Sequence, residues 1–117
     1  MLLLYIGLGV AVPAAVIAGR GEAEGGVGNL RTVSIGGREE RGKQLFRQTC
    51  ASCHTLGAVN ARGVTGPNLD EIGAVTPERV VSAIRIGGSG QGRMPERLLE
   101  GQDARDVALY VSKVAGR

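Results

Sequence analysis

The segment "CASCH" at residues 50–54 constrains the fold more than any other stretch of this 117-residue chain. It gathers both cysteines and the only histidine within five positions. This spacing is typical of three kinds of site: a thiol–disulfide redox pair, half of a zinc site, or an attachment site for a c-type haem. Each kind needs a different fold around it, so the rest of the sequence decides among them.

Zinc and thiol chemistry find little support elsewhere in the sequence. A zinc site needs four ligands, usually two pairs with their own spacing, and beyond this segment only aspartate and glutamate remain. A thioredoxin-like pair sits at a strand-to-helix junction, but no segment has a convincing strand period. A disulfide between residues three apart closes almost no loop and leaves His54 unexplained.

Haem attachment accounts for every residue of the segment. Positions i and i+3 of a helical turn share one face, so Cys50 and Cys53 can bond the two vinyl groups along one haem edge. His54 then directs its imidazole at the iron. The cofactor would also supply bulk that a chain with 20 glycines and three aromatic residues lacks, because so small a core is marginal without help.

The periodicity predicts an all-α domain with long loops. Residues 39–50 have apolar or small side chains at helical spacing. Residues 76–88 read as a helix with Thr76 as N-cap, Pro77 at its first position and Gly87–Gly88 as its stop. A third helix over residues 101–116 has a stripe made of Ala104, Val107, Ala108, Val111 and Ala115. Residues 55–75 and 87–96, rich in glycine and proline, are expected to be loops.

Residues 1–19 have no charged side chain and predict a transmembrane anchor. As one helix they would reach about 28 Å, close to the hydrocarbon core of a bilayer. A cleaved signal peptide is the competing interpretation, with "VIAG" as a weak cleavage site, but no basic residue precedes the apolar run. Gly7, Ala11 and Ala15 form a stripe that is a candidate contact for transmembrane helices of a larger complex. The predicted organisation is therefore an anchor or uncleaved signal (1–19), a flexible Gly-rich linker (20–37) and a haem domain (38–117).

From about Gly42 to Val114 the chain resembles the small monohaem class I cytochromes c. The resemblance rests on "CASCH", on "GPNL" at 66–69, on "RMP" at 93–95, and on a Gly–Phe helix before the haem site paired with an aromatic residue in the last helix. It implies a cytochrome c-like fold around one covalent haem c. It also implies that the Pro67 carbonyl accepts from His54 Nδ1–H, that Leu69 packs on the haem face, and that Gly42 and Phe46 cross Tyr110.

Met94 is the candidate for the sixth iron ligand. The only other methionine is Met1, and the residues before Met94 form a helix and a Gly-rich loop that give the chain room to reach the opposite haem face. Pro95 restrains the backbone beside it. The family's tryptophan partner for a haem propionate is missing, so Arg62, Asn68 and Arg93 are candidates for that contact.

The predicted function is one-electron transfer on the outer face of a bacterial membrane, either as a tethered shuttle or as the haem subunit of an oxidoreductase complex. Haem attachment in the family takes place on that side, which outweighs the opposite orientation that Arg20 suggests under the positive-inside rule. Redox proteins and the membrane are the expected partners. The net charge of +3 comes from scattered arginines without interleaved aromatic residues, so nucleic-acid binding is not expected. No catalytic constellation is visible. The alternative function is a haem enzyme or gas sensor with an open sixth position.

Overall fold

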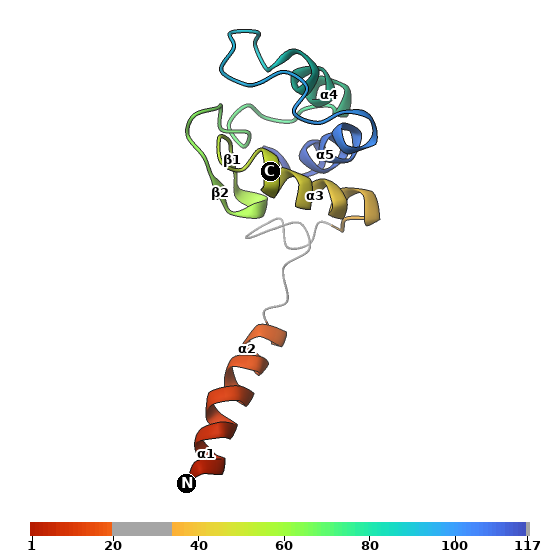
Figure 1. Cartoon of the computed structure of the whole chain (residues 1–117). Helices are drawn as coiled ribbons and strands as arrows, with labels where there is room; N and C mark the ends of the chain where they lie inside the picture. Colours follow the sequence, from red (N-terminus) through yellow and green to blue (C-terminus); the bar gives the residue numbers. More distant parts are fainter. Residues whose placement is uncertain (20–33, 117) are drawn as a thin grey trace.

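The computed structural model describes residues 1–19 and 34–116 (Figure 1). The first part is helical throughout, in the order α1 (Leu2–Ile6), η1 (Gly7–Ala11) and α2 (Val12–Gly19). The second part contains three longer helices and two very short strands. Its elements are α3 (Gly37–Thr49), β1 (Thr55–Leu56), η3 (Gly57–Val59), β2 (Ala61–Arg62), α4 (Pro77–Ile86) and α5 (Gly101–Val114).

The predicted transmembrane helix over residues 1–19 is not found. The run is helical but divided, because η1 is a π-helical stretch just before Pro13, and proline has no N–H for the regular i→i−4 bond. Among the described residues, no helix combines the length and the apolarity needed to cross a membrane. Residues 20–33 of the predicted linker lie outside the described part.

The three predicted helices of the haem domain are confirmed, with small shifts at their ends. Thr76 caps α4 by accepting a hydrogen bond from Arg79 N at 3.3 Å, and Gly87 ends it in the left-handed conformation at φ 74°. Glu39, in the first turn of α3, caps the start of this helix, because its carboxylate accepts a hydrogen bond from Gly36 N at 3.0 Å. The regular secondary structure of the domain is therefore mainly helical, as the sequence predicts.

A small antiparallel ladder was not predicted from the sequence. β1 and β2 pair Thr55 with Arg62 and Leu56 with Ala61. Two residues are too few to show an alternating pattern, so periodicity cannot detect such a strand. The ladder closes the first long loop directly after His54.

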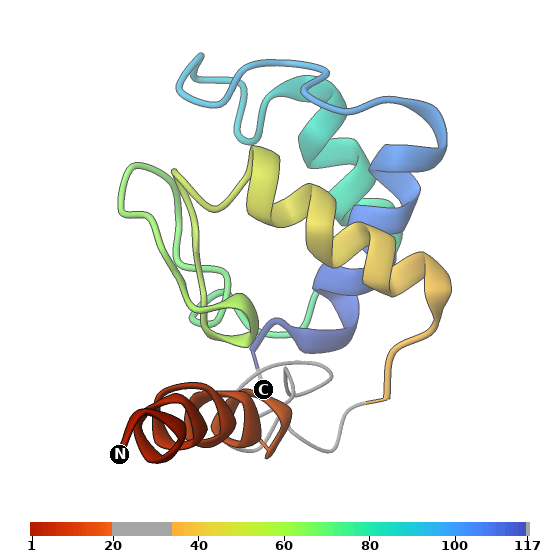
Figure 2. The ribbon, with the colours of Figure 1, turned by 60° about the horizontal axis from the view of Figure 1, so that its bottom comes forward.

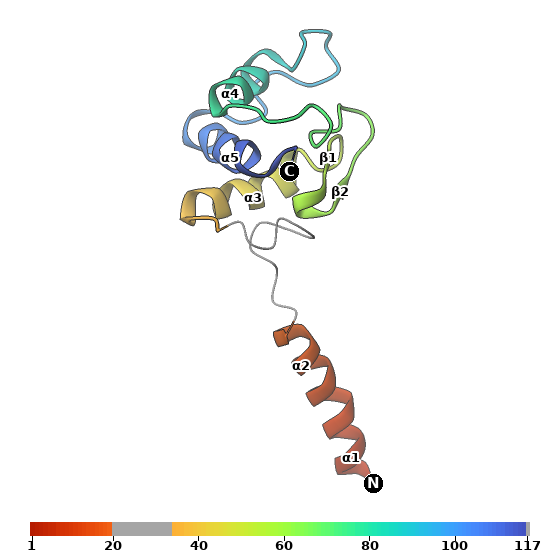
Figure 3. The same cartoon turned by 180° about the vertical axis from the view of Figure 1, so that it is seen from behind.

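The core lies where α3 crosses α5, as Figures 2 and 3 show from two sides. The largest fully buried side chains are Tyr110, Phe46, Leu56, Val107 and Val114. A Cβ on Gly42 would collide with the Asp106 carbonyl and lie 3.0 Å from Tyr110 Cβ. The crossing therefore depends on glycine at position 42, and the implied packing of Gly42 and Phe46 against Tyr110 is found.

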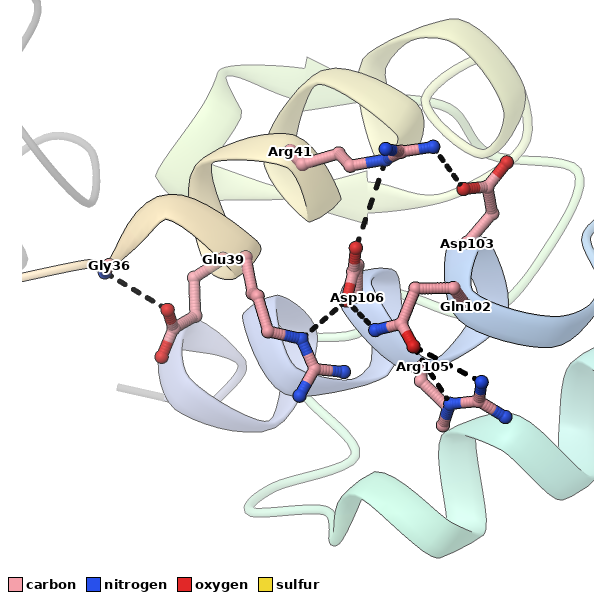
Figure 4. A network of polar contacts seen from close by, with 8 residues as sticks. Gly36, Glu39, Arg41, Gln102, Asp103, Arg105 and Asp106 are labelled. Carbon is pink, nitrogen blue, oxygen red and sulfur yellow. Dashed lines mark hydrogen bonds and ion pairs between the residues drawn. The ribbon is translucent and has the colours of Figure 1, made fainter.

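A polar cluster at one edge of this crossing fixes α5 to α3 (Figure 4). The Asp106 carboxylate is 3% exposed and accepts from Arg38 Nε at 2.9 Å and from Gln102 Nε2 at 2.7 Å, with Arg41 Nε at 3.8 Å. Burial alone would raise the pKa of Asp106. The hydrogen bonds from Gln102 and Arg38 and the charges of Arg38 and Arg41 outweigh it and hold this pKa below the usual range of an aspartate.

Asp106→Asn is expected to lower the free energy of unfolding by about 2 kcal/mol near neutral pH, because charge-assisted hydrogen bonds are lost from a buried position. A carboxylate whose pKa is depressed in the folded state stabilises above its unfolded pKa and loses that contribution as the pH falls. The difference between wild type and variant should therefore shrink below about pH 4. Denaturant unfolding across this pH range measures it.

Asp103→Asn is the matched control. Asp103 binds Arg41 Nη2 at 2.6 Å, but its side chain is 38% exposed and that of Arg41 is 60% exposed. Pairs at such exposure contribute less than about 1 kcal/mol. An equal loss in both variants would show that burial of Asp106 does not matter.

Candidate haem site

The candidate site begins where α3 ends. Cys50 N–H still donates to Phe46 O at 2.8 Å, and a last turn follows in which Cys53 N and His54 N donate to Cys50 O at 3.1 and 3.0 Å. This turn keeps the i, i+3 relation between the two cysteines. Cys50 is buried, Cys53 is half-buried, and neither forms a disulfide.

The burial of Cys50 argues against thiol exchange. Burial, with a smaller effect of Cys53, raises the pKa of the Cys50 thiol to about 11. Reactive thiols have the opposite shift, because the thiolate is the nucleophile. In the described residues, no cluster of three or more histidine, cysteine or acidic side chains could hold a metal ion. The zinc interpretation therefore lacks a donor set.

His54 is held from one side of its ring. Nδ1 lies 2.8 Å from the carbonyl oxygen of Pro67, so the tautomer with a proton on Nδ1 donates this bond and leaves Nε2 free to bind a metal. Gly66 lies flat against the same ring: a Cβ there would be 2.5 Å from His54 Cε1 and 3.0 Å from Nε2. The histidine is thus oriented as an axial ligand would need to be.

Met94 belongs to the second long loop, which follows α4. It is half-buried against the core and lies beside Gly88, where a Cβ would be in ordinary contact with Met94 Sδ at 3.6 Å. Gly88 adopts φ 68° and continues the turn that ends α4. In Figure 2 the loop after His54 lies at the left of the helices, and the loop after α4 lies above them.

The residues present fit a haem. One loop provides two unpaired cysteines and a histidine with one free nitrogen, and the other provides a thioether. Leu69, Val80 and Met94 pack against the core while remaining half-exposed, which suits contact with a large apolar ring. Gly66 lies so close to the His54 ring that any side chain at this position would collide with it.

Two of the three propionate candidates are engaged locally, and the third, Arg93, is exposed. Arg62 Nε donates to Asn60 Oδ1 at 3.3 Å, and Asn68 Oδ1 accepts from Asp70 N at 3.0 Å. A separate groove of about 730 Å³ between α4 and α5, lined among others by Val81, Arg85 and Leu99, contains none of the candidate haem residues.

Sequence reasoning missed two residues that shape the site. A Cβ on Gly63 would lie 2.5 Å from Cys53 C and 2.6 Å from His54 N. Thr55 donates its hydroxyl to Gly63 O at 2.8 Å. The only sequence signal for these two residues was Gly63 itself, a second glycine three residues before Gly66.

Comparisons with known proteins give the same class of protein. Residues 37–111 match the family described as "Cytochrome C oxidase, cbb3-type, subunit III". The crystal structure of the c-type cytochrome SorU from Sinorhizobium meliloti matches with a TM-score of 0.58 at 40% identity, over 68% of this chain and 93% of that one. The chain is therefore a class I c-type cytochrome and belongs to this cytochrome c family. Its cofactor is a covalently bound haem c.

Two curated relatives match this chain over only part of their own length. Cytochrome c-551 of Bacillus subtilis is 33% identical over 72 residues, which are 62% of this chain and 60% of that protein. The cytochrome bc1 complex cytochrome c subunit of Mycobacterium tuberculosis is 28% identical over 89 residues, 75% of this chain and 31% of the relative. The chain thus spans less than two thirds of the length of either.

Proposed function

We propose that this domain transfers single electrons through a haem c that Cys50 and Cys53 would bond covalently and whose iron His54 and Met94 would hold. The observation that carries the proposal is the His54 Nδ1–Pro67 O contact of 2.8 Å. It lies directly beside a cysteine pair held on one helical turn. Family membership supports an electron carrier rather than an enzyme.

When bound, haem c supplies one-electron chemistry between ferric and ferrous iron. Pro67 fixes the tautomer of His54 and raises the basicity of Nε2. Leu69 and Met94, both half-buried against the core, would pack on the haem ring and keep water from it. The thioether of Met94 would favour the ferrous state relative to a second histidine and would keep small molecules from the iron.

The proposed place of work is the outer side of a bacterial membrane. The family attaches its haem there, and the relatives named as bc1 complex subunits support membership in a respiratory complex. The small c-type cytochromes among the matches support a separate shuttle equally. Purification in mild detergent distinguishes them, since a subunit elutes with a stable set of other chains and a shuttle elutes alone.

The experiment that tests the function is ligand exclusion by the wild-type protein. The ferrous protein should titrate reversibly with one electron and should not bind carbon monoxide at neutral pH. Ready binding of carbon monoxide would contradict electron transfer and favour the alternative function, a haem enzyme or gas sensor with an open sixth position.

A further inference from the structure

Thr55, the residue directly after His54, is bonded to both ends of the segment that faces the histidine ring. Its hydroxyl donates to Gly63 O at 2.8 Å, and its own carbonyl accepts from Leu69 N at 3.0 Å. The Thr55 side chain is half-buried, where a hydrogen bond competes less with water. One residue thus holds segment 63–69 at two points.

Between these points the segment packs closely against Cys53 and His54. Gly63 approaches the Cys53–His54 peptide so closely that a Cβ would lie 2.5 Å from Cys53 C. Gly66 N donates to Cys53 O at 2.7 Å, and Gly66 lies flat on the imidazole. The next residue, Pro67, presents its carbonyl to Nδ1. The position of the segment therefore decides whether that carbonyl reaches the ring.

We propose that the Thr55 hydroxyl is a positioning group for the axial histidine. By holding Gly63 O, it keeps the segment close enough for the Pro67 carbonyl to accept from His54 Nδ1–H without interruption. This inference rests on the proposed function, because it matters for electron transfer only if His54 binds the iron. Without the hydroxyl, the segment moves away from His54. The hydrogen bond from His54 Nδ1–H to the Pro67 carbonyl then opens more often.

The test is the exchange of the His54 Nδ1 proton with solvent, followed by NMR in the reduced, haem-loaded protein. In Thr55→Val, which keeps the shape of the side chain, we expect exchange at least about tenfold faster than in wild type. Thr55→Ala should give the same increase, because it also lacks the hydroxyl, and it is a second route should the valine variant not fold. Thr55→Ser retains the hydroxyl and should exchange like wild type.

The reduction potential is the second readout. A less firmly bonded imidazole is a less basic ligand and stabilises ferric iron less, so the midpoint potential should rise in Thr55→Val and Thr55→Ala but not in Thr55→Ser. Ser112→Ala is the matched control, since Ser112 Oγ donates to Leu109 O at 2.9 Å within α5, where it is also half-buried. It should change neither readout.

If the His54 Nδ1 proton exchanges in Thr55→Val as slowly as in wild type and the midpoint potential is also unchanged, the inference is overturned. The proposed function would remain intact. Equal changes in Ser112→Ala would overturn it too, because they would trace the effect to general loosening of the fold. A wild-type protein without covalent haem would overturn the proposed function and this inference with it.

Discussion

Met94→Ala is expected to turn a protein closed to carbon monoxide into one that binds it readily in the ferrous state. The wild-type iron has two axial ligands in this account, and removal of the thioether leaves one position open. The affinity for carbon monoxide should rise by at least about a hundredfold, since about 2.7 kcal/mol of competing ligation suffices for that factor. Difference spectra during titration of the reduced protein measure it.

The same variant should lose the weak far-red band that sulfur-to-iron ligation gives in the oxidised protein. Leu99→Ala is a suitable control, because Leu99 also packs half-buried against the core from the segment after the same loop but carries no ligand atom. An unchanged far-red band in Met94→Ala would show that another group binds the iron.

Gly42→Ala is expected to have the largest effect on stability of any single methyl group added to the domain. The new Cβ would meet the backbone of Asp106, at 2.6 Å from its carbonyl carbon, and Tyr110 Cβ at 3.0 Å. Backbone cannot move aside as a flexible side chain does, so α5 must shift relative to α3. We expect a net loss of about 3 kcal/mol in the free energy of unfolding, at the upper end for overpacked cores.

Gly37→Ala is the matched control on the same helix. A Cβ at Gly37 would meet nothing within 4 Å, and alanine has the higher helix propensity. This variant should be as stable as wild type or gain up to about 1 kcal/mol. Thermal or denaturant unfolding of both haem-loaded variants provides the comparison, and equal stability of the two would contradict the close crossing of α3 and α5.

The helices could be predicted from the sequence because their signals are local. Thr76 and Gly87 lie at the two ends of α4 and mark them without reference to the rest of the chain. The stripe from Ala104 to Ala115 repeats at helical spacing, and the structure buries each of its five members. The cysteine pair and His54 were equally accessible to prediction, because five consecutive residues define the motif.

Contacts between distant segments could not be predicted in the same way. Lys43 and Asp106 are each 2% exposed, although charged residues are seldom buried. Asp106 is buried because Arg38, 68 residues earlier, bonds it, and no local pattern signals such a partner. The hydrogen bond from the Thr55 hydroxyl to Gly63 O could not be predicted for the same reason.

The predicted membrane helix lacks support in the described residues for a different reason. Composition alone measured how apolar residues 1–19 are, but not how continuous the helix is. Hydropathy assigns no cost to the missing N–H of Pro13 or to the π-helical turn at Gly7–Ala11 that precedes it.

The measurement that tests the central claim most directly is whether the haem stays on the chain after denaturation. The protein, produced in cells that attach c-type haem, is extracted with acidified acetone and then run on a denaturing gel stained for haem peroxidase activity. The account predicts a stained band for wild type and a weak or absent one for Cys50→Ala. Complete release of haem from the wild-type protein into the acetone would contradict it.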